Sequence, residues 1–218
     1  MKILIDDFIQ NSNAPETLKS PALADITQFS SLPITLDSVQ TFDSIGVGNC
    51  DSPTISINGE IITIDPTEEN GLYTLNTPQT TDSVLIEFPS STKIGRIGIG
   101  MGRIICASPA REPGFWSTAK PRTTLSGQVI PGVGGVSGRI ISVDFRYKFT
   151  KEIFEDVQRA YTYQIGQGFP FFISFTDSPL VDRYPWKRLY AFTDLKWIFQ
   201  SSTAYFLYSK KMKFTEAF

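Results

Sequence analysis

Residues that usually carry catalysis are scarce in this sequence, and histidine is absent from all 218 positions. Without an imidazole there is no general base for a Ser-His-Asp or Cys-His system and no His ligand for zinc or iron. The two cysteines, Cys50 and Cys106, form no CxxC motif, and we expect both to be free thiols in a reducing compartment. The sequence therefore predicts no metal site, no cofactor and no histidine-dependent hydrolase.

Carboxyl groups remain as candidates for acid-base chemistry, because a glycosidase needs only two of them facing each other across a cleft. The adjacent pairs Asp6-Asp7 and Glu68-Glu69 point their members in different directions, so we interpret them as solvated surface charge. The segment 65–70 offers oxygen ligands without the spacing of a calcium loop, and we expect a turn there. No pair of carboxyl groups is identified by the sequence as a catalytic pair. The sequence therefore favours a protein that is not an enzyme.

Two glycine-rich segments could suggest phosphate-binding loops. The segment 95–102 alternates glycine with apolar residues, but it lacks G-x-x-x-x-G-K-[ST] and no amphipathic helix follows it. We predict an extended strand whose missing side chains let another backbone or ring approach. The segment 131–138 contains no lysine, so its glycines favour a loop or a turn between strands.

The segment 182–188 is the first candidate binding site. Trp, Tyr and Arg are the residue types that dominate interface hot spots, and this segment contains Arg183, Tyr184, Trp186 and Arg188. The alternative is that Trp186 packs into the core while the charged side chains stay solvated.

The second candidate is Phe115-Trp116, in a stretch from 109 to 121 that we expect to be irregular. An aromatic pair in such a stretch suits a sugar platform, a pocket on a partner or an anchor for the loop itself.

Composition narrows the class of partner. The 20 basic and 22 acidic side chains nearly cancel, so no global field attracts nucleic acid or an anionic membrane. No run approaches the ~20 apolar residues of a membrane helix, and two Asp interrupt residues 1–9 where a signal peptide needs an apolar run. Aromatic residues make up 13% of the chain, which favours sheets and subunit contacts.

The N-terminal half is predicted to form an extended segment and short strands. Residues 1–40 contain scattered proline and asparagine, and we predict an extended N-terminal arm that lies on a neighbour. The segment 54–64 alternates apolar residues around Asn58-Gly59, which predicts a β-hairpin with a type I′ turn. Further strands are expected at 72–75 and 83–88.

The C-terminal half adds one helix. Residues 141–149 alternate apolar and polar side chains, which predicts a half-buried strand. The segment 151–164 carries an apolar stripe at helical spacing and is the one convincing helix. Buried or paired strands are expected at 169–175, 188–199 and 203–214.

These elements predict a mainly β fold, an antiparallel jelly roll or β-sandwich with one amphipathic helix and an extended N-terminal arm. We expect the arm to comprise residues 1–40 and the sandwich domain residues 41–218.

Several segments resemble virion proteins of long-tailed bacteriophages that have a galactose-binding-like, discoidin-type jelly roll. The similarity lies in residues 42–59, 71–75, 93–100, 124–129 and 169–175. The resemblance implies a structural subunit of a tail tip, baseplate or tail-associated ring, which assembles symmetrically with itself and with other virion tail proteins. It also implies that the chain is made in the host cytoplasm and resides in the virion tail.

Two functions therefore compete. The first is a non-enzymatic assembly subunit of a phage tail or baseplate. The second is a carbohydrate-binding module for host-surface recognition, in which exposed aromatics bind a glycan; its candidate residues are Phe115, Trp116, Tyr184 and Trp186. A histidine-free carboxylate hydrolase is a distant third.

Overall fold

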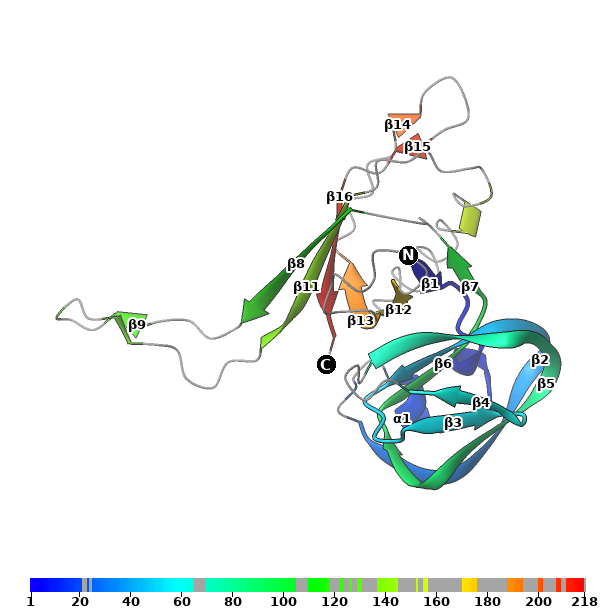
Figure 1. The fold of residues 1–218 in the computed structure, drawn as a ribbon. Coiled ribbons are helices and arrows are strands. Elements are labelled where there is room, and N and C mark those ends of the chain that lie inside the picture. Colours follow the sequence, from blue (N-terminus) through cyan, green and yellow to red (C-terminus); the bar gives the residue numbers. More distant parts are fainter. Residues whose placement is uncertain are drawn as a thin grey trace.

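The computed structural model confirms a mainly β protein built on two antiparallel sheets, a β-sandwich (Figure 1). The residues that the structure describes are 1–20, 23, 25–64, 70–104, 110–117, 122–123, 126, 129–130, 137–144, 152, 155–156, 170–175, 188–193, 200–201, 207–208 and 211–217.

The smaller sheet has five strands in the order β4-β3-β5-β2-β6. Their bounds are β2 Thr27–Gly48, β3 Thr54–Ile57, β4 Glu60–Thr63, β5 Asn70–Ile94 and β6 Arg96–Gly100. The expected strands at 72–75 and 83–88 are two parts of the single long strand β5.

The hairpin around Asn58-Gly59 is confirmed. β3 pairs with β4 from Ile57↔Glu60 to Thr54↔Thr63. Asn58 and Gly59 take φ values of 47° and 87°, as the tight turn requires.

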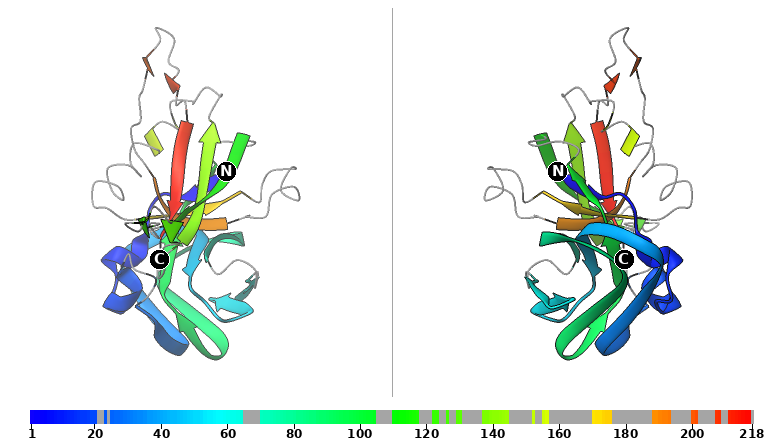
Figure 2. Two further views of the ribbon diagram at one scale, coloured as in Figure 1. Left: turned by 90° about the vertical axis from the view of Figure 1, so that its left-hand side faces the viewer. Right: turned by 90° about the vertical axis from the view of Figure 1, so that its right-hand side faces the viewer.

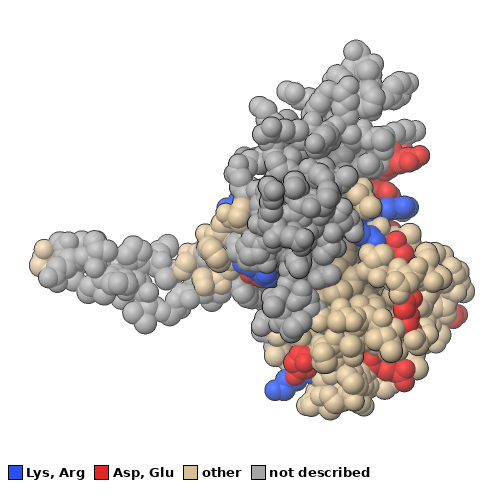
Figure 3. Space-filling view, in the orientation of Figure 1, with Lys and Arg blue, Asp and Glu red and all other residues tan. Residues whose placement is uncertain are grey.

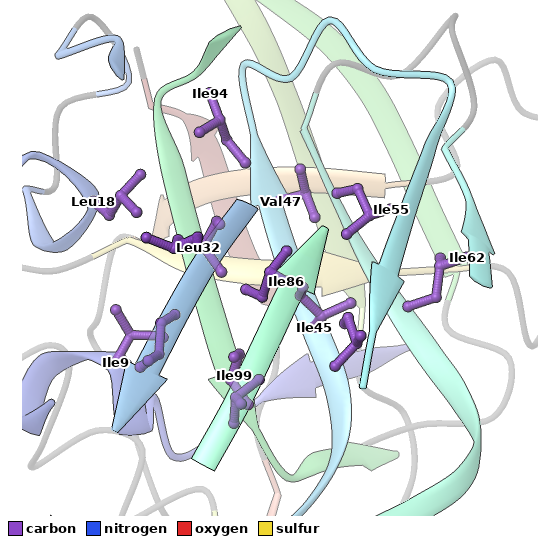
Figure 4. Packing of buried hydrophobic residues seen from close by; sticks show 14 of the residues in the cluster. Ile9, Leu18, Leu32, Ile45, Val47, Ile55, Ile62, Ile86, Ile94 and Ile99 are labelled. Carbon is purple, nitrogen blue, oxygen red and sulfur yellow. The ribbon is translucent and has the colours of Figure 1, made fainter. Parts of the chain in front are cut away.

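The long pair β2–β5 curls because its register is interrupted. Register shifts fall between Thr35 and Gln40 and between Phe42 and Ser44, and such irregularities bend and twist a strand. The curled sheet encloses a core of mostly aliphatic side chains, to which the short helices η1 (Phe8–Asn11) and α1 (Glu16–Lys19) add Ile9 and Leu18 (Figure 4).

The larger sheet has seven strands in the order β7-β1-β12-β13-β16-β11-β8. Their bounds are β1 Lys2–Leu4, β7 Gly102–Ile104, β8 Ala110–Ser117, β11 Ser137–Asp144, β12 Phe171–Ser174, β13 Arg188–Thr193 and β16 Lys211–Glu216. In the side views, β16, β11 and β8 rise away from the curled β2–β5 pair (Figure 2).

The N-terminal segment is packed into the body and is not the extended arm that we expected. β1 lies between β7 and β12, and Met1, Leu4 and Ile5 are fully buried. The expected boundary at residue 40 falls inside the continuous strand β2. Sequence reasoning failed here because the partners of β1 lie about 100 and 170 residues further along the chain.

Glycines in β2 and β6 let the two sheets pack closely, as the sequence predicted for the Gly–Ile alternation. Ile97 and Ile99 point into the five-stranded core, whereas Gly98 and Gly100 face the other sheet. A Cβ at Gly98 would lie 3.0 Å from the Phe172 ring, and one at Gly100 would lie 1.5 Å from the backbone oxygen of Asp6. The sheets meet in a second apolar cluster, which consists of Leu4, Leu23, Leu72, Phe172, Tyr190 and Ala217.

Several C-terminal predictions are confirmed where the structure describes them. Phe171–Ser174 is a buried strand, and Ile141 and Val143 are buried on β11. β13 and β16 pair antiparallel, but the chain between them includes a further pair, β14 (Gln200–Ser201) with β15 (Leu207–Tyr208).

The predicted helix 151–164 lies mostly outside the described residues. Glu152, Glu155 and Asp156 are described and helical. Asp156 forms an ion pair with Arg103 of β7, with 3.2 Å between Oδ2 and Nε, so this helical residue lies beside the edge of the seven-stranded sheet.

Candidate functional site

Phe115 and Trp116 lie on β8, the outermost strand of the seven-stranded sheet. The stretch 109–121 is thus a regular strand over Ala110–Ser117, contrary to our expectation of irregular chain. Phe115 is 77% exposed, the largest value among the exposed large hydrophobic residues that the structure describes. Of the predicted roles, this exposure fits a binding platform and not an anchor packed against the body.

β8 is one half of a long projecting ribbon. It pairs with β11 from Ala110↔Asp144 to Ser117↔Ser137, and within the intervening segment β9 (Arg122–Thr123) pairs antiparallel with β10 (Val129–Ile130) in a separate two-stranded sheet. We call the segment 110–144 the β8–β11 arm. In Figure 1, β8 and β11 extend away from the body, and β9 lies further out on the same side.

The arm leaves the body at a partly buried ion pair. Arg139 on β11 lies opposite Phe115 on β8, and its side chain contacts Glu216 on β16. Its backbone N–H donates to Glu216 Oε2 at 2.9 Å, its Nε donates to Oε1 at 2.7 Å, and a guanidinium nitrogen donates to Oε1 as well. Because the Glu216 side chain is only 7% exposed, this charge-assisted contact fixes the base of the arm against the sheet.

The two aromatic clusters are not brought together in the sheet. Arg188 begins β13, which β16 and β11 separate from β8. Arg183, Tyr184 and Trp186 lie outside the described residues, as do the side chains of Trp116 and Arg188. The candidate site that the structure supports therefore consists of Phe115 and the arm that carries it.

The second member of the Asp6-Asp7 pair is buried, so our interpretation of both as solvated charge was wrong. The Asp7 and Arg96 side chains are 4% and 3% exposed, and their Oδ2 and guanidinium nitrogen lie 2.7 Å apart. Asp7 Oδ1 also accepts bonds from the backbone N–H groups of Ile9 and Ile99. Arg96 donates to the carbonyls of Leu18 and Ser20.

Burial raises the pKa of the Asp7 carboxyl, and this exceeds the opposing effects of Arg96 and the backbone N–H groups. Burial also raises the pKa of the nearby Tyr190 phenol. The bonds of this pair that we describe join the start of η1, the end of α1 and strand β6, so the pair holds the N-terminal segment on the five-stranded sheet.

Lys2 makes a similar cross-link at the other end of β1. Its Nζ donates to Thr74 Oγ1 at 2.9 Å and lies 3.7 Å from Asp43 Oδ2. Asp43 Oδ1 accepts from the N–H of Gly102 and from Ser44 Oγ. The carboxylate is thus engaged in structural bonds.

Among the described residues there is no group of three or more His, Cys, Asp or Glu side chains that could hold a metal ion. Cys50 is a partly buried free thiol, as expected, and Cys106 lies outside the described residues. Within the described ranges, no helix is both long and apolar enough to span a membrane.

Sequence reasoning identified Phe115 but missed the arm that presents it. The signal was present, because two runs of residues with strand propensity flank a Gly- and Pro-rich centre over 110–144. Taken one at a time, these runs predict an irregular stretch, a loop and a separate strand, because each local pattern is silent about pairing. The Arg139–Glu216 contact spans 77 residues and leaves no local signal.

Comparison with known proteins found no matching family model, no similar curated protein and no similar solved structure.

Proposed function

We propose that this chain is a non-enzymatic assembly subunit of a bacteriophage tail or baseplate, and that the β8–β11 arm makes its contacts with other subunits. The observation that carries the proposal is the exposure of Phe115, at 77%, on an edge strand that runs out into a projecting two-stranded ribbon. The tail assignment rests on the sequence resemblance of residues 42–59, 93–100 and 169–175.

A lone two-stranded ribbon is unstable. A two-stranded hairpin without a packed face is marginally stable in water, and an exposed aromatic ring adds a cost that burial against a partner would remove. Such a ribbon gains order and free energy when it docks, which suits a protein whose task is to join copies.

The outer edge of β8 favours side-chain contacts over strand addition. Pro113 pairs with Ile141 in the middle of β8 and has no N–H to offer a further strand. Proline on an edge strand is one of the features that prevent uncontrolled sheet extension. We therefore assign the contact to the ring of Phe115 and its neighbours on the arm.

Light scattering over a concentration series tests the proposal with three proteins: wild type, Phe115→Asp and the control Val39→Asp. Val39 is 61% exposed on β2, so the control places the same charge at a similarly exposed site away from the arm. We expect wild type and Val39→Asp to exceed the chain mass of 24.3 kDa and Phe115→Asp to shift toward it. Circular dichroism checks that all three fold.

A wild-type protein that stays monomeric at every concentration, and joins no component of a tail fraction, would contradict the proposal. The same exposed ring also favours the second candidate, a carbohydrate-binding module. Saturable glycan binding by the monomer, lost in Phe115→Ala, would establish that function instead.

A further inference from the structure

Two Asn-Gly dipeptides occur in this chain, Asn58-Gly59 and Asn70-Gly71. The dipeptide has a chemistry of its own, because a glycine has no Cβ to keep its backbone nitrogen away from the side-chain amide of the preceding asparagine. The two dipeptides lie in different surroundings, so the fold decides which of them reacts.

Asn58-Gly59 forms the turn of the β3–β4 hairpin, and both residues are exposed. Among the described residues, no atom lies within 4 Å of the position that a Cβ on Gly59 would take. The turn leads into β4, the outer strand of the five-stranded sheet, over which Figure 3 shows mainly uncharged side chains with acidic ones among them. Water therefore reaches the turn, which can open locally while the core stays folded.

Asn70-Gly71, by contrast, is buried at the start of β5. Asn70 is 6% exposed, and its Oδ1 accepts the backbone N–H of Asn49 at 2.9 Å. The two residues of the dipeptide pair with Gly48 and Val47 of β2. Rotation of the backbone here would break the pairing inside the sheet, so it requires unfolding of the sheet.

The reaction open to an Asn-Gly dipeptide is deamidation. The Gly59 backbone nitrogen attacks Cγ of Asn58 and forms a C–N bond, while Nδ2 leaves as ammonia with the proton that the Gly59 nitrogen gives up. Water then opens the cyclic imide at one of its two carbonyls, which yields aspartate or isoaspartate. The turn has to rotate before the nitrogen can attack, so the rate depends on how firmly the turn and the Asn58 amide are held.

Strand β5 holds the Asn58 amide. Asn58 Nδ2 donates to Gln79 Oε1 at 2.7 Å, and Asn58 Oδ1 accepts the N–H of Leu85 at 2.7 Å. The backbone N–H of Asn58 also donates to the Leu85 carbonyl at 2.9 Å. Gln79 Nε2 donates to the Ile57 carbonyl at 3.3 Å, so the Gln79 side chain bridges β5 and the hairpin. These bonds draw the amide toward β5 and oppose the rotation that the attack requires.

We propose that Asn58 is a site of spontaneous deamidation in the folded protein, and that Gln79 restrains the rate of this reaction. The turn belongs to the five-stranded sheet and not to the β8–β11 arm, so the reaction does not depend on assembly. Aspartate at position 58 keeps an acceptor for the Leu85 N–H but loses the donor to Gln79. Isoaspartate adds a carbon to the backbone of a two-residue turn, which disturbs the register of β3 and β4.

Peptide mapping by mass spectrometry tests the proposal, because it distinguishes asparagine from its products at both positions. The full-length protein is incubated in mild alkali, either folded or denatured in urea, and is sampled over time. In the denatured chain we expect both asparagines to react. In the folded wild type we expect Asn58 to react more slowly than in the denatured chain, and Asn70 to stay intact.

Gln79→Ala removes the side chain that restrains the amide. We expect the rate at Asn58 to rise about fivefold, as the loss of one hydrogen bond of ordinary strength predicts. The control Gln28→Ala, at an exposed position of β2 opposite Lys93, should leave the rate unchanged. Asn70 reports on folding in the same sample, because a variant that simply unfolds reacts at both positions.

Faster reaction in Gln79→Ala at Asn58 alone would support the proposal. Three results would overturn it: equal rates at Asn58 and Asn70 in the folded wild type, no reaction at Asn58 in that protein, or a rate at Asn58 that Gln79→Ala leaves unchanged.

Discussion

The five-stranded sheet and the β8–β11 arm use the same antiparallel pairing but bury their side chains to different extents. The sheet curls around a core that includes Ile45, Ile86 and Ile99, each at most 1% exposed. The arm leaves Phe115 exposed and has no second layer among the described residues beyond its base at Arg139. Pairing alone gives a strand its shape, whereas stability comes from what the strand packs against.

The five-stranded sheet and the arm differ in how they are stabilised. The five-stranded sheet and the β1 segment are held together within one chain by buried ion pairs and close glycine contacts. Among the described residues of the arm, such a contact is found at its base, and under the proposed function a partner buries the rest.

The largest loss of stability is expected from breaking the buried ion pair between Asp7 and Arg96. Asp7→Ala leaves the Arg96 guanidinium buried without its carboxylate, and we expect the free energy of unfolding to fall by about 3–5 kcal/mol. Urea denaturation at low protein concentration measures this. The matched control is Asp37→Ala at an exposed position of β2, where a change within about 0.5 kcal/mol is expected. Equal effects of the two substitutions would show that the pair does not hold the N-terminal segment.

The next largest loss of stability is expected from adding a side chain to a glycine where the two sheets pack together. Gly100→Ala forces a Cβ against the backbone oxygen of Asp6, and we expect a loss of about 3 kcal/mol in the free energy of unfolding. Gly114→Ala on the arm is the control, because its Cβ would meet only the Ile140 oxygen at 4.0 Å. The same denaturation experiment compares them, and a tolerated Gly100→Ala would contradict the close packing of β6 on the β1 segment.

These positions show which parts of the fold the sequence made predictable. Asn58-Gly59 and the Ile–Gly alternation at 95–102 carry local turn and packing signals, and both were predicted correctly. The burial of Leu4 was not predicted, because it depends on strands about 100 and 170 residues away in sequence. Long-range strand order leaves no local pattern to detect.

The candidate site was predictable only in part. Phe115 was singled out by residue type, but its exposure depends on β8 being the edge strand of its sheet.

The smallest expected effect is on the reaction rate of the Cys50 thiol, which lies beside the five-stranded core. Burial raises the pKa of this thiol, so less thiolate is present at pH 8 and we expect it to react more slowly with a disulfide reagent than a free peptide thiol does. The rate should still be climbing above pH 9, as the thiolate fraction grows. A Cys106→Ser background isolates the signal, and a rate equal to that of the peptide would show that Cys50 is not packed against the core.

Amide hydrogen exchange at low and high protein concentration tests the central comparison most directly, because it reports on both regions in one sample. We predict that amides of β2, β5 and β6 exchange slowly at both concentrations, and that amides of β8 and β11 beyond Arg139 become protected only where the protein associates. An arm as protected in the dilute monomer as the five-stranded sheet, or one that stays unprotected in the assembly, would contradict the account.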